Sequence, residues 1–237
     1  MNVLVIGGSG RVASVVLPYL KQHHTLRVFD LKAPADASLD HVIGNVGDID
    51  AMTEAARGMD ALLYMAMGAL DWQTHTGMHT AFDVNVKGVY LSLHAARQAG
   101  VMHAVYCSSM SVYDGALDKQ YFFDEDMPPN ARGLYGLTKR MGEEACSNAC
   151  YLHGMSVNAL RLCFPMADDT WMALDRSGTN VLATAASDLS NALHAALMYR
   201  NGFQAFMISG DYAQTVINLA KAKRVLGWEP LARQTPP

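Results

Sequence analysis

Residues 3–13 read Val-Leu-Val-Ile-Gly-Gly-Ser-Gly-Arg-Val-Ala, and this stretch decides the fold. Its first four residues form a short, wholly apolar run, which is typical of a strand buried on both faces of a parallel sheet. A glycine-rich turn follows, and residues 12–20 then continue with helical periodicity. A strand, a glycine-rich turn and a helix in this order predict a βα unit that binds the phosphates of a dinucleotide.

The small residues of the turn and one later carboxylate have separate roles in such a unit. Gly7 permits the tight turn, Gly10 lets the backbone approach a pyrophosphate, and Ala13 lets the helix pack closely on the strand. The N-terminus of the helix supplies unpaired N–H groups and a positive potential. Asp30 ends the second predicted strand, 20 residues after Gly10, where a carboxylate accepts hydrogen bonds from the adenosine ribose. Its charge favours NAD over NADP, although Lys32 lies nearby.

Predicted strands and helices alternate along most of the chain. Further strands are expected at residues 26–30, 41–46, 61–66, 103–108, 156–162 and 206–208, and helices at residues 50–57, 81–99, 135–153, 187–199 and 219–226. The alternation predicts an α/β fold with a doubly wound parallel sheet of the Rossmann type. After Arg161 it weakens, and residues 165–184 show no clear period. We therefore expect an NAD-binding domain over residues 1–163 and a small C-terminal substrate lobe, partly interleaved with the sheet, over residues 164–237.

Composition narrows the class of protein. The formal net charge is −4 and no run of Lys and Arg is present, so nothing favours a nucleic-acid partner. The four cysteines have neither zinc nor disulfide spacing, and the sequence predicts buried thiols and no metal site. No secretory signal pattern and no apolar run of about 20 residues is seen. We expect a cytoplasmic protein.

A tyrosine and a lysine lie four residues apart in Tyr135-Gly-Leu-Thr-Lys139, within a predicted helix. Positions i and i+4 share one face of a helix, and an ammonium close to a phenol favours the ionised form of the phenol. Such a pair is common by itself. It gains meaning here because it follows a phosphate-binding turn, an acidic strand end and a Ser-Ser pair at the end of a strand.

Because these residues occur in this order, the chain resembles the extended short-chain dehydrogenase/reductases, specifically their NAD-dependent epimerase/dehydratase family. Besides the turn and Asp30, the motifs that carry the resemblance are Asp83-Val-Asn-Val-Lys-Gly88, Tyr106-Cys-Ser-Ser-Met-Ser-Val-Tyr113, Tyr135-Gly-Leu-Thr-Lys139, Leu160-Arg161, Ser187-Asp-Leu189 and Ala222-Lys-Arg-Val-Leu-Gly-Trp228. They extend over nearly the whole chain.

The resemblance implies catalytic roles. Tyr135 is the expected general acid/base, and Lys139 is expected to favour its ionised form and to hold the nicotinamide ribose. Ser109, four residues before Tyr113, is expected to hydrogen-bond the reacting oxygen, with Ser108 as the alternative. Asn85 matches an asparagine that supports the strand end and a proton relay.

The resemblance also implies an NAD site, in which Asn45 departs from the family's Asp and keeps an acceptor but loses the charge. The residues expected to bind the cofactor are Gly7, Ser9, Gly10, Arg11, Val12, Asp30, Leu31, Asn45, Val46, Ala66, Tyr135 and Lys139.

Three functions stay open within this resemblance, and a fourth is disfavoured. Dehydratases carry an Asp-Glu pair after the catalytic Ser or Thr, whereas Met110 and Ser111 stand here. The segment Arg161-Leu-Cys-Phe-Pro165 lacks the Asn of nucleotide-sugar enzymes and is more similar to hexuronate dehydrogenases. We therefore expect an NAD-dependent oxidoreductase that acts on a hydroxyl of a small sugar or sugar acid. The alternatives are a nucleotide-sugar epimerase and a non-catalytic NAD-sensing regulator.

The family resemblance also implies a homodimer formed through the predicted helices at residues 81–99 and 135–153.

Two histidines and two tryptophans lie outside the motifs. His75 and His79 are expected to contact solvent or substrate rather than a metal, and Trp72 and Trp171 are expected either in the substrate cleft or in the core.

Overall fold

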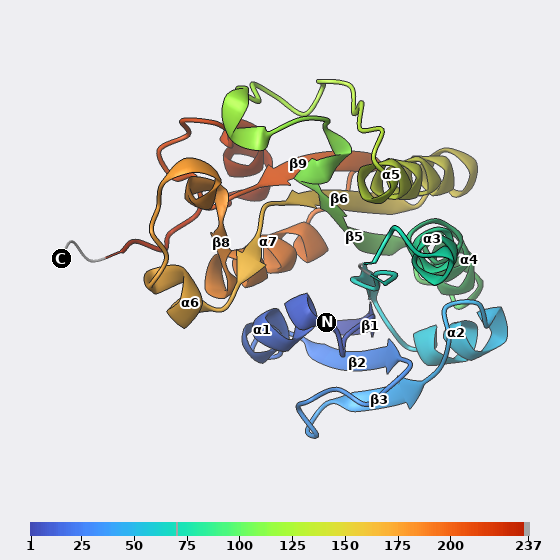
Figure 1. Ribbon diagram of the computed structural model, residues 1–237. Helices are drawn as coiled ribbons and strands as arrows, with labels where there is room; N and C mark the ends of the chain where they lie inside the picture. Colours follow the sequence, from blue (N-terminus) through green and yellow to red (C-terminus); the bar gives the residue numbers. More distant parts are fainter. Residues whose placement is uncertain (70, 235–237) are drawn as a thin grey trace.

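A computed structural model describes residues 1–69 and 71–234 of the chain. Its centre is a seven-stranded sheet in the order β3-β2-β1-β4-β5-β6-β9, in which every pair of neighbours is parallel (Figure 1). The strands are β1 (Asn2–Ile6), β2 (Thr25–Asp30), β3 (Asp40–Ile43), β4 (Ala61–Tyr64), β5 (His103–Ser109), β6 (Ser156–Leu162) and β9 (Phe203–Ile208). The strand order reverses between β1 and β4, as in a doubly wound sheet. The predicted Rossmann-type fold is confirmed.

Helices cover both faces of the sheet because its strands are apolar on both sides. One face carries α1 (Arg11–Leu20) and α7 (Ala186–Met198), which pack against each other, and the other carries α2 (Ile49–Ala56), α4 (Val89–Gln98) and α5 (Leu134–His153) (Figure 1). Two separate apolar clusters result, one under each layer. In β1, Val3 and Val5 enter the first cluster, whereas Leu4 and Ile6 enter the second.

The helix predicted at residues 81–99 has a different form. It begins earlier as α3 (His75–Phe82), passes through a π-helical turn (Asp83–Gly88) and continues as α4. The Tyr64 hydroxyl donates a hydrogen bond of 2.6 Å to the Val84 carbonyl, inside the π turn. A Cβ on Gly88 would lie 2.5 Å from the same Tyr64 oxygen. The turn therefore forms where a buried tyrosine of β4 presses against the helix, a contact that helical periodicity does not reveal.

Residues 165–184, which show no period, contain only short elements. These are β7 (Pro165–Met166), α6 (Asp168–Met172), a 3-10 turn (Gly178–Leu182) and β8 (Thr184–Ala185), with β7 paired to β8. The Trp171 side chain is 1% exposed and its indole donates to the Ala183 carbonyl, so this tryptophan belongs to the core. Because β9 joins the main sheet beside β6 and α7 packs on α1, the chain beyond residue 163 is interleaved with the sheet. The lobe boundary itself stays a prediction.

The C-terminal part is tied to α7 by one buried carboxylate. Asp188 is 2% exposed and accepts hydrogen bonds from the backbone N–H groups of Leu231 and Ala232. Burial raises the pKa of this carboxyl. Within the described ranges, no helix has the length and apolar character needed to cross a membrane.

Candidate active site

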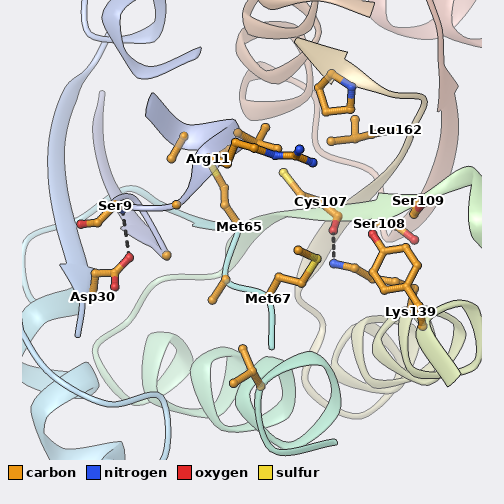
Figure 2. A pocket seen from close by; sticks show the side chains of 18 of the residues that line it. Ser9, Arg11, Asp30, Met65, Met67, Cys107, Ser108, Ser109, Lys139 and Leu162 are labelled. Atoms are coloured by element: carbon orange, nitrogen blue, oxygen red, sulfur yellow. Dashed lines mark hydrogen bonds between the residues drawn. The ribbon is translucent and has the colours of Figure 1, made fainter. Parts of the chain in front are cut away.

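A cavity of about 620 Å³ lies at the carboxyl ends of the parallel strands, where ligands bind in sheets of this kind. Figure 2 shows Ser9 and Asp30 at one end of this cofactor cavity and Ser108, Ser109 and Lys139 at the other. Among the residues expected to bind the cofactor, all twelve line this cavity. The fold therefore brings these twelve residues together around one cavity, and their binding of the cofactor stays a prediction.

The glycine-rich turn is packed against the strand end of β4. Gly7 has a φ of +83°, and a Cβ placed on it would lie 2.3 Å from the backbone N of Ala66. Gly10 caps α1 without any side-chain hydrogen bond, and no acidic residue lies in the first helical turn. The first N–H groups of α1 are thus directed to the cavity without an internal partner, which suits a pyrophosphate.

Asp30 lies at the end of β2 and is held by the backbone. Its Oδ2 accepts a hydrogen bond of 2.9 Å from Ser9 N, and its Oδ1 accepts one of 2.6 Å from Leu31 N (Figure 2). Each carboxylate oxygen keeps a lone pair for a further donor, so the pair of ribose hydroxyls of an adenosine fits this position. The uncapped N-terminus of α1 and the fixed Asp30 carboxylate at the end of β2 both line this cavity. Together they fit the phosphates and the ribose of a dinucleotide.

The segment after β3 forms the side wall of the same end. Asn45 Oδ1 accepts a hydrogen bond of 2.8 Å from Gly47 N, which makes it a turn residue, and Val46 is half-buried beside it. Leu31 leaves its side chain 70% exposed at the cavity rim. Apolar groups at this place suit the flat face of an adenine. The predicted strand at residues 41–46 ends at Ile43, because residues 44–47 turn around the Asn45 side chain.

Tyr135 and Lys139 both face the cavity from the first turns of α5. Lys139 is 4% exposed, and its Nζ donates a hydrogen bond of 2.8 Å to the Cys107 carbonyl of β5 (Figure 2). The same Nζ lies 5.9 Å from the centre of the Tyr135 ring. The backbone of β5 therefore positions the ammonium on the same side of the cavity as the Tyr135 ring.

The two serines at the end of β5 differ in their hydrogen bonds. Ser108 donates a bond of 2.6 Å to Glu143 Oε1 and is thereby occupied. Ser109 accepts a bond of 3.1 Å from Ser111 N, so its own hydroxyl proton stays available. Both line the cavity. This difference supports Ser109, rather than Ser108, as the donor to a reacting oxygen.

Asn85 does not reach the cavity. It is fully buried, its Oδ1 accepts from Gly68 N at 3.0 Å, and its Nδ2 donates to Thr138 Oγ1 at 3.1 Å. Thr138 in turn donates to the Tyr135 carbonyl at 3.0 Å. Asn85 therefore acts in this structure as a positioning residue that ties the loop after β4 to the helix that carries Tyr135.

A buried charged network supports the catalytic end from below. Arg161 of β6 donates to both oxygens of Glu143, at 3.0 and 2.8 Å, and also to the Tyr113 hydroxyl. The side chain of Arg161 is 4% exposed and that of Glu143 is 6% exposed. Because Glu143 also accepts from Ser108, the network connects α5, β5 and β6 directly under Ser109 and Lys139. Nothing in the sequence motifs predicts this pairing, since the partners are 18 residues apart and on different elements.

Several lining residues are not among the expected catalytic or cofactor-binding residues. Met65 and Met67 follow β4, and Phe164 follows β6. Their position just beyond the carboxyl end of a strand is the signal that identifies them. Cys107 also lines the cavity, but burial raises the pKa of its thiol to about 12. It therefore stays protonated at neutral pH and is no nucleophile.

Phe164 has an unusual backbone conformation. Its φ is +37°, in the left-handed region that a bulky side chain rarely adopts. This conformation costs about 1–2 kcal/mol, and strain of this kind is concentrated at functional sites. The ring is nevertheless 49% exposed, so it gains little from burial.

A second cavity of about 420 Å³ adjoins the first, and five residues line both. The shared residues are Trp72, Ser111, Leu117, Tyr135 and Phe164. The Trp72 indole is stacked on the Tyr135 ring, with centroids 4.8 Å apart and planes 7° apart. Trp72 thus belongs to the site, whereas His75 and His79 line neither cavity. The general acid/base candidate lies at the junction, between a cofactor cavity and what we term the substrate cavity.

The parallel sheet, the dinucleotide-shaped cavity and the Tyr–Lys pair define a short-chain dehydrogenase/reductase. Residues 3–226 match the model of the NAD-dependent epimerase/dehydratase family. The chain belongs to this family of enzymes, whose cofactor is NAD.

Curated relatives with different activities match at comparable distance. The chain is similar to a 3-beta-hydroxysteroid dehydrogenase of Mycolicibacterium neoaurum (35% identical over 154 residues, 60% of this chain and 42% of the relative). It is also similar to a uronate dehydrogenase of Pseudomonas syringae pv. tomato (26% over 185 residues, 73% and 66%) and to a UDP-glucose 4-epimerase of Lactobacillus helveticus (29% over 169 residues, 68% and 51%). The alignments cover 42 to 66% of the length of these relatives.

Solved structures share the fold over 98% of this chain. One is a short-chain dehydrogenase/reductase superfamily protein from Agrobacterium tumefaciens with bound NAD (TM-score 0.81, 21% identical, 93% of that chain). Another is a mutated uronate dehydrogenase (TM-score 0.78, 21% identical, 82% of that chain). At this identity the likeness establishes the Rossmann-type architecture.

Proposed function

We propose that this protein oxidises a secondary hydroxyl of a small sugar-type substrate with NAD. The observation that carries the proposal is the position of Tyr135, at the junction of the cofactor cavity and the substrate cavity. A group there reaches a hydroxyl held in the second cavity while it stays beside a cofactor held in the first.

The chain's own residues supply proton transfer and orientation. Tyr135 acts as the general base that takes the proton from the substrate hydroxyl, and Ser109 donates a hydrogen bond to the same oxygen. Bound NAD would supply the hydride acceptor for the conversion of the alcohol into a carbonyl, with NADH as the other product. Gly7, Gly10 and the start of α1 would hold its phosphates, and Asp30 would hold its adenosine ribose.

Two other reactions of the family differ in what this site would need. A dehydratase needs an acid and a base after Ser109, whereas Met110 is fully buried and Ser111 carries only a hydroxyl. An epimerase needs the same Tyr, Lys and Ser and returns the hydride to its substrate. The chain is similarly distant from uronate dehydrogenases and UDP-glucose 4-epimerases, so an assay must separate these two.

The test follows NADH absorbance when the purified protein and NAD meet a panel of aldoses, uronic acids and UDP-sugars. Net NADH release with a free sugar or sugar acid is the expected result. Conversion of a UDP-sugar without net NADH would replace the proposal by an epimerase. An absence of turnover with intact NAD binding would favour the NAD-sensing regulator.

The Tyr135→Phe variant tests the mechanism. Loss of the hydroxyl that carries the proton should lower kcat by about 10²–10⁴, while NADH affinity, measured by fluorescence titration, changes little. The matched control is Tyr151→Phe, because Tyr151 lies on the same helix and is 87% exposed. Equal activity of the two variants would contradict the assignment of Tyr135.

The homodimer through α4 and α5 stays part of this proposal, as does a cytoplasmic location. Exposed apolar side chains on these helices are compatible with a dimer. They include Tyr90 on α4, 51% exposed, and Met141 on α5, 38% exposed. Light scattering in solution measures the oligomeric state directly.

A further inference from the structure

The substrate cavity is bounded by aromatic side chains where it meets the catalytic tyrosine. Trp72 comes from the segment between β4 and α3, and Phe164 comes from the turn after β6. Both also line the cofactor cavity, so they lie beside the site of hydride transfer. One face of Trp72 stacks on the Tyr135 ring, with centroids 4.8 Å apart, so the indole lies directly against the catalytic tyrosine.

The polar groups of this cavity are neutral or negative. Ser111 and Thr179 contribute hydroxyls, and Asp114 contributes an exposed carboxylate. Among the described residues that line the cavity, none is a Lys, Arg or His. The cations Arg11, Lys32 and Lys139 all line the cofactor cavity instead, where the phosphates and ribose of a dinucleotide need them.

The charge of the cavity selects against anions. A carboxylate or a diphosphate that leaves water needs a cationic partner, and Arg is the usual partner because it binds such groups with two parallel hydrogen bonds. Asp114 would instead repel an anion. An uncharged ring with hydroxyl groups needs only donors and acceptors along its edge and an apolar surface under its face. Hydrogen-bonding groups for the edge come from Ser111, Thr179 and Asp114. The apolar surface for the face comes from Trp72 and Phe164.

The strained conformation of Phe164 points in the same direction. Asn adopts the left-handed region more readily than a bulky residue does, yet this chain holds a half-exposed phenyl ring there. A bulky residue in that conformation is retained where its side chain has a use. A ring that lines both cavities has that use if it contacts a ligand.

We propose that Trp72 and Phe164 form the apolar walls of a subsite for an uncharged ring that bears a secondary hydroxyl, and that sugar acids and nucleotide-sugars are poor substrates. This inference rests on the proposed oxidation of a hydroxyl and names the substrate class. The ring belongs either to a neutral pyranose or to an alicyclic alcohol, since both present an apolar face and a secondary hydroxyl.

The experiment compares matched substrates under one set of conditions. NADH formation is measured with D-galactose and D-galacturonate, with D-glucose and D-glucuronate, with UDP-glucose, and with cyclohexanol. The neutral member of a sugar pair should exceed its acid in kcat/KM by about tenfold or more, which is the scale of a charge left without a partner. Cyclohexanol as the better substrate would assign the alicyclic source, and galactose or glucose would assign the pyranose.

Variants test the walls themselves. Phe164→Asn should raise KM for the preferred neutral substrate about tenfold with kcat within about twofold. Its melting temperature should be equal or higher, because Asn accommodates the left-handed φ. An unchanged melting temperature would separate a higher KM from a loss of folding. The matched control is Phe123→Asn, which removes an exposed ring (56%) that lines neither cavity. An unchanged KM for Phe164→Asn would overturn the role of its ring.

One exposed cation needs its own control. Arg132 lies between two lining residues, Ala131 and Gly133, but does not line the cavity itself. The Arg132→Gln variant should leave the preference unchanged. A preference of the unaltered protein for the acid of each pair would overturn the proposed subsite, while the oxidation of a hydroxyl would stand.

If none of these compounds is oxidised, the proposed function is contradicted. The subsite is then tested by a measurement of ligand binding. The NADH-loaded protein is then titrated with methyl β-D-galactopyranoside and with D-galacturonate, and tryptophan fluorescence is recorded. Quenching by the neutral ligand that is lost in Trp72→Phe supports the subsite, because the other two tryptophans are buried. No quenching by the neutral ligand, or stronger quenching by the acid, would overturn it.

Discussion

The two ends of the cofactor cavity are held in place by different means. At the dinucleotide end, backbone meets backbone: Gly7 packs against Ala66, and Asp30 accepts from two main-chain N–H groups. At the catalytic end, buried side chains do the positioning, through the pair of Glu143 and Arg161. At the dinucleotide end, a side chain added to Gly7 would collide with the Ala66 backbone. At the catalytic end, removal of Glu143 would leave the buried charge of Arg161 without its counter-charge. Each end should therefore fail under a different kind of substitution.

The largest effect is expected at the catalytic end. Glu143→Ala removes one member of a buried ion pair and leaves Arg161 unpaired, which should lower the free energy of unfolding by about 3–5 kcal/mol. The measurement is denaturant unfolding followed by circular dichroism. The matched control is Glu54→Ala, which breaks an exposed pair with Arg57 (side chains 75% and 65% exposed) and should cost less than about 1 kcal/mol. Similar losses in both variants would remove the distinction between the two ends.

Gly7→Ala tests the dinucleotide end. The new Cβ would meet the Ala66 backbone at 2.3 Å, so the turn must shift and NAD affinity should fall by about 100-fold. Gly100→Ala is the control, because Gly100 has nearly the same φ, +85°, but nothing within 4 Å of its Cβ position. The control should lose only about 1 kcal/mol of stability and no affinity. Calorimetric titration with NADH measures the affinity. An NAD affinity of Gly7→Ala equal to that of Gly100→Ala would contradict the requirement for close packing at this turn.

A third, smaller effect is expected within the helix layer that α1 and α7 form on one face of the sheet. His24, after α1, lies 2.9 Å from His194 of α7, measured between Nε2 and Nδ1. Burial, with the charge of His194, lowers the pKa of His24 to about 4. The neutral form is thus favoured in the folded state, and stability present above pH 6.5 is lost as the pH falls toward 4.

The loss between pH 6.5 and 4 should be roughly 1–3 kcal/mol. His24→Gln should reduce this pH dependence, whereas His153→Gln, which alters an exposed histidine, should not. The readout is the urea midpoint at several pH values. An equal slope in the unaltered protein and in His24→Gln would assign the acid sensitivity to other groups.

Much of the cofactor end was readable from sequence because its determinants are local. Gly7, Gly10 and Ala13 stand within one turn, and Asp30 stands at the next strand end, where spacing alone places it. Tyr135 and Lys139 share a helix face for the same reason. The motif also predicts a catalytic role for Asn85, whereas its contacts with Gly68 and Thr138 place it outside the cavity.

The sequence by itself determined the fold class, the family resemblance and the cofactor, because strand periodicity, a glycine turn and an i to i+4 pair are short-range properties of the chain. Only the tertiary structure decided that Ser109 rather than Ser108 keeps a free hydroxyl, since Glu143, which occupies Ser108, comes from another element. It also brought Trp72 onto Tyr135 and Phe164 beside them. These residues lie far apart in the chain, and the contacts between them depend on how the strand ends converge. The cofactor site follows from local order, and the substrate cavity follows from packing.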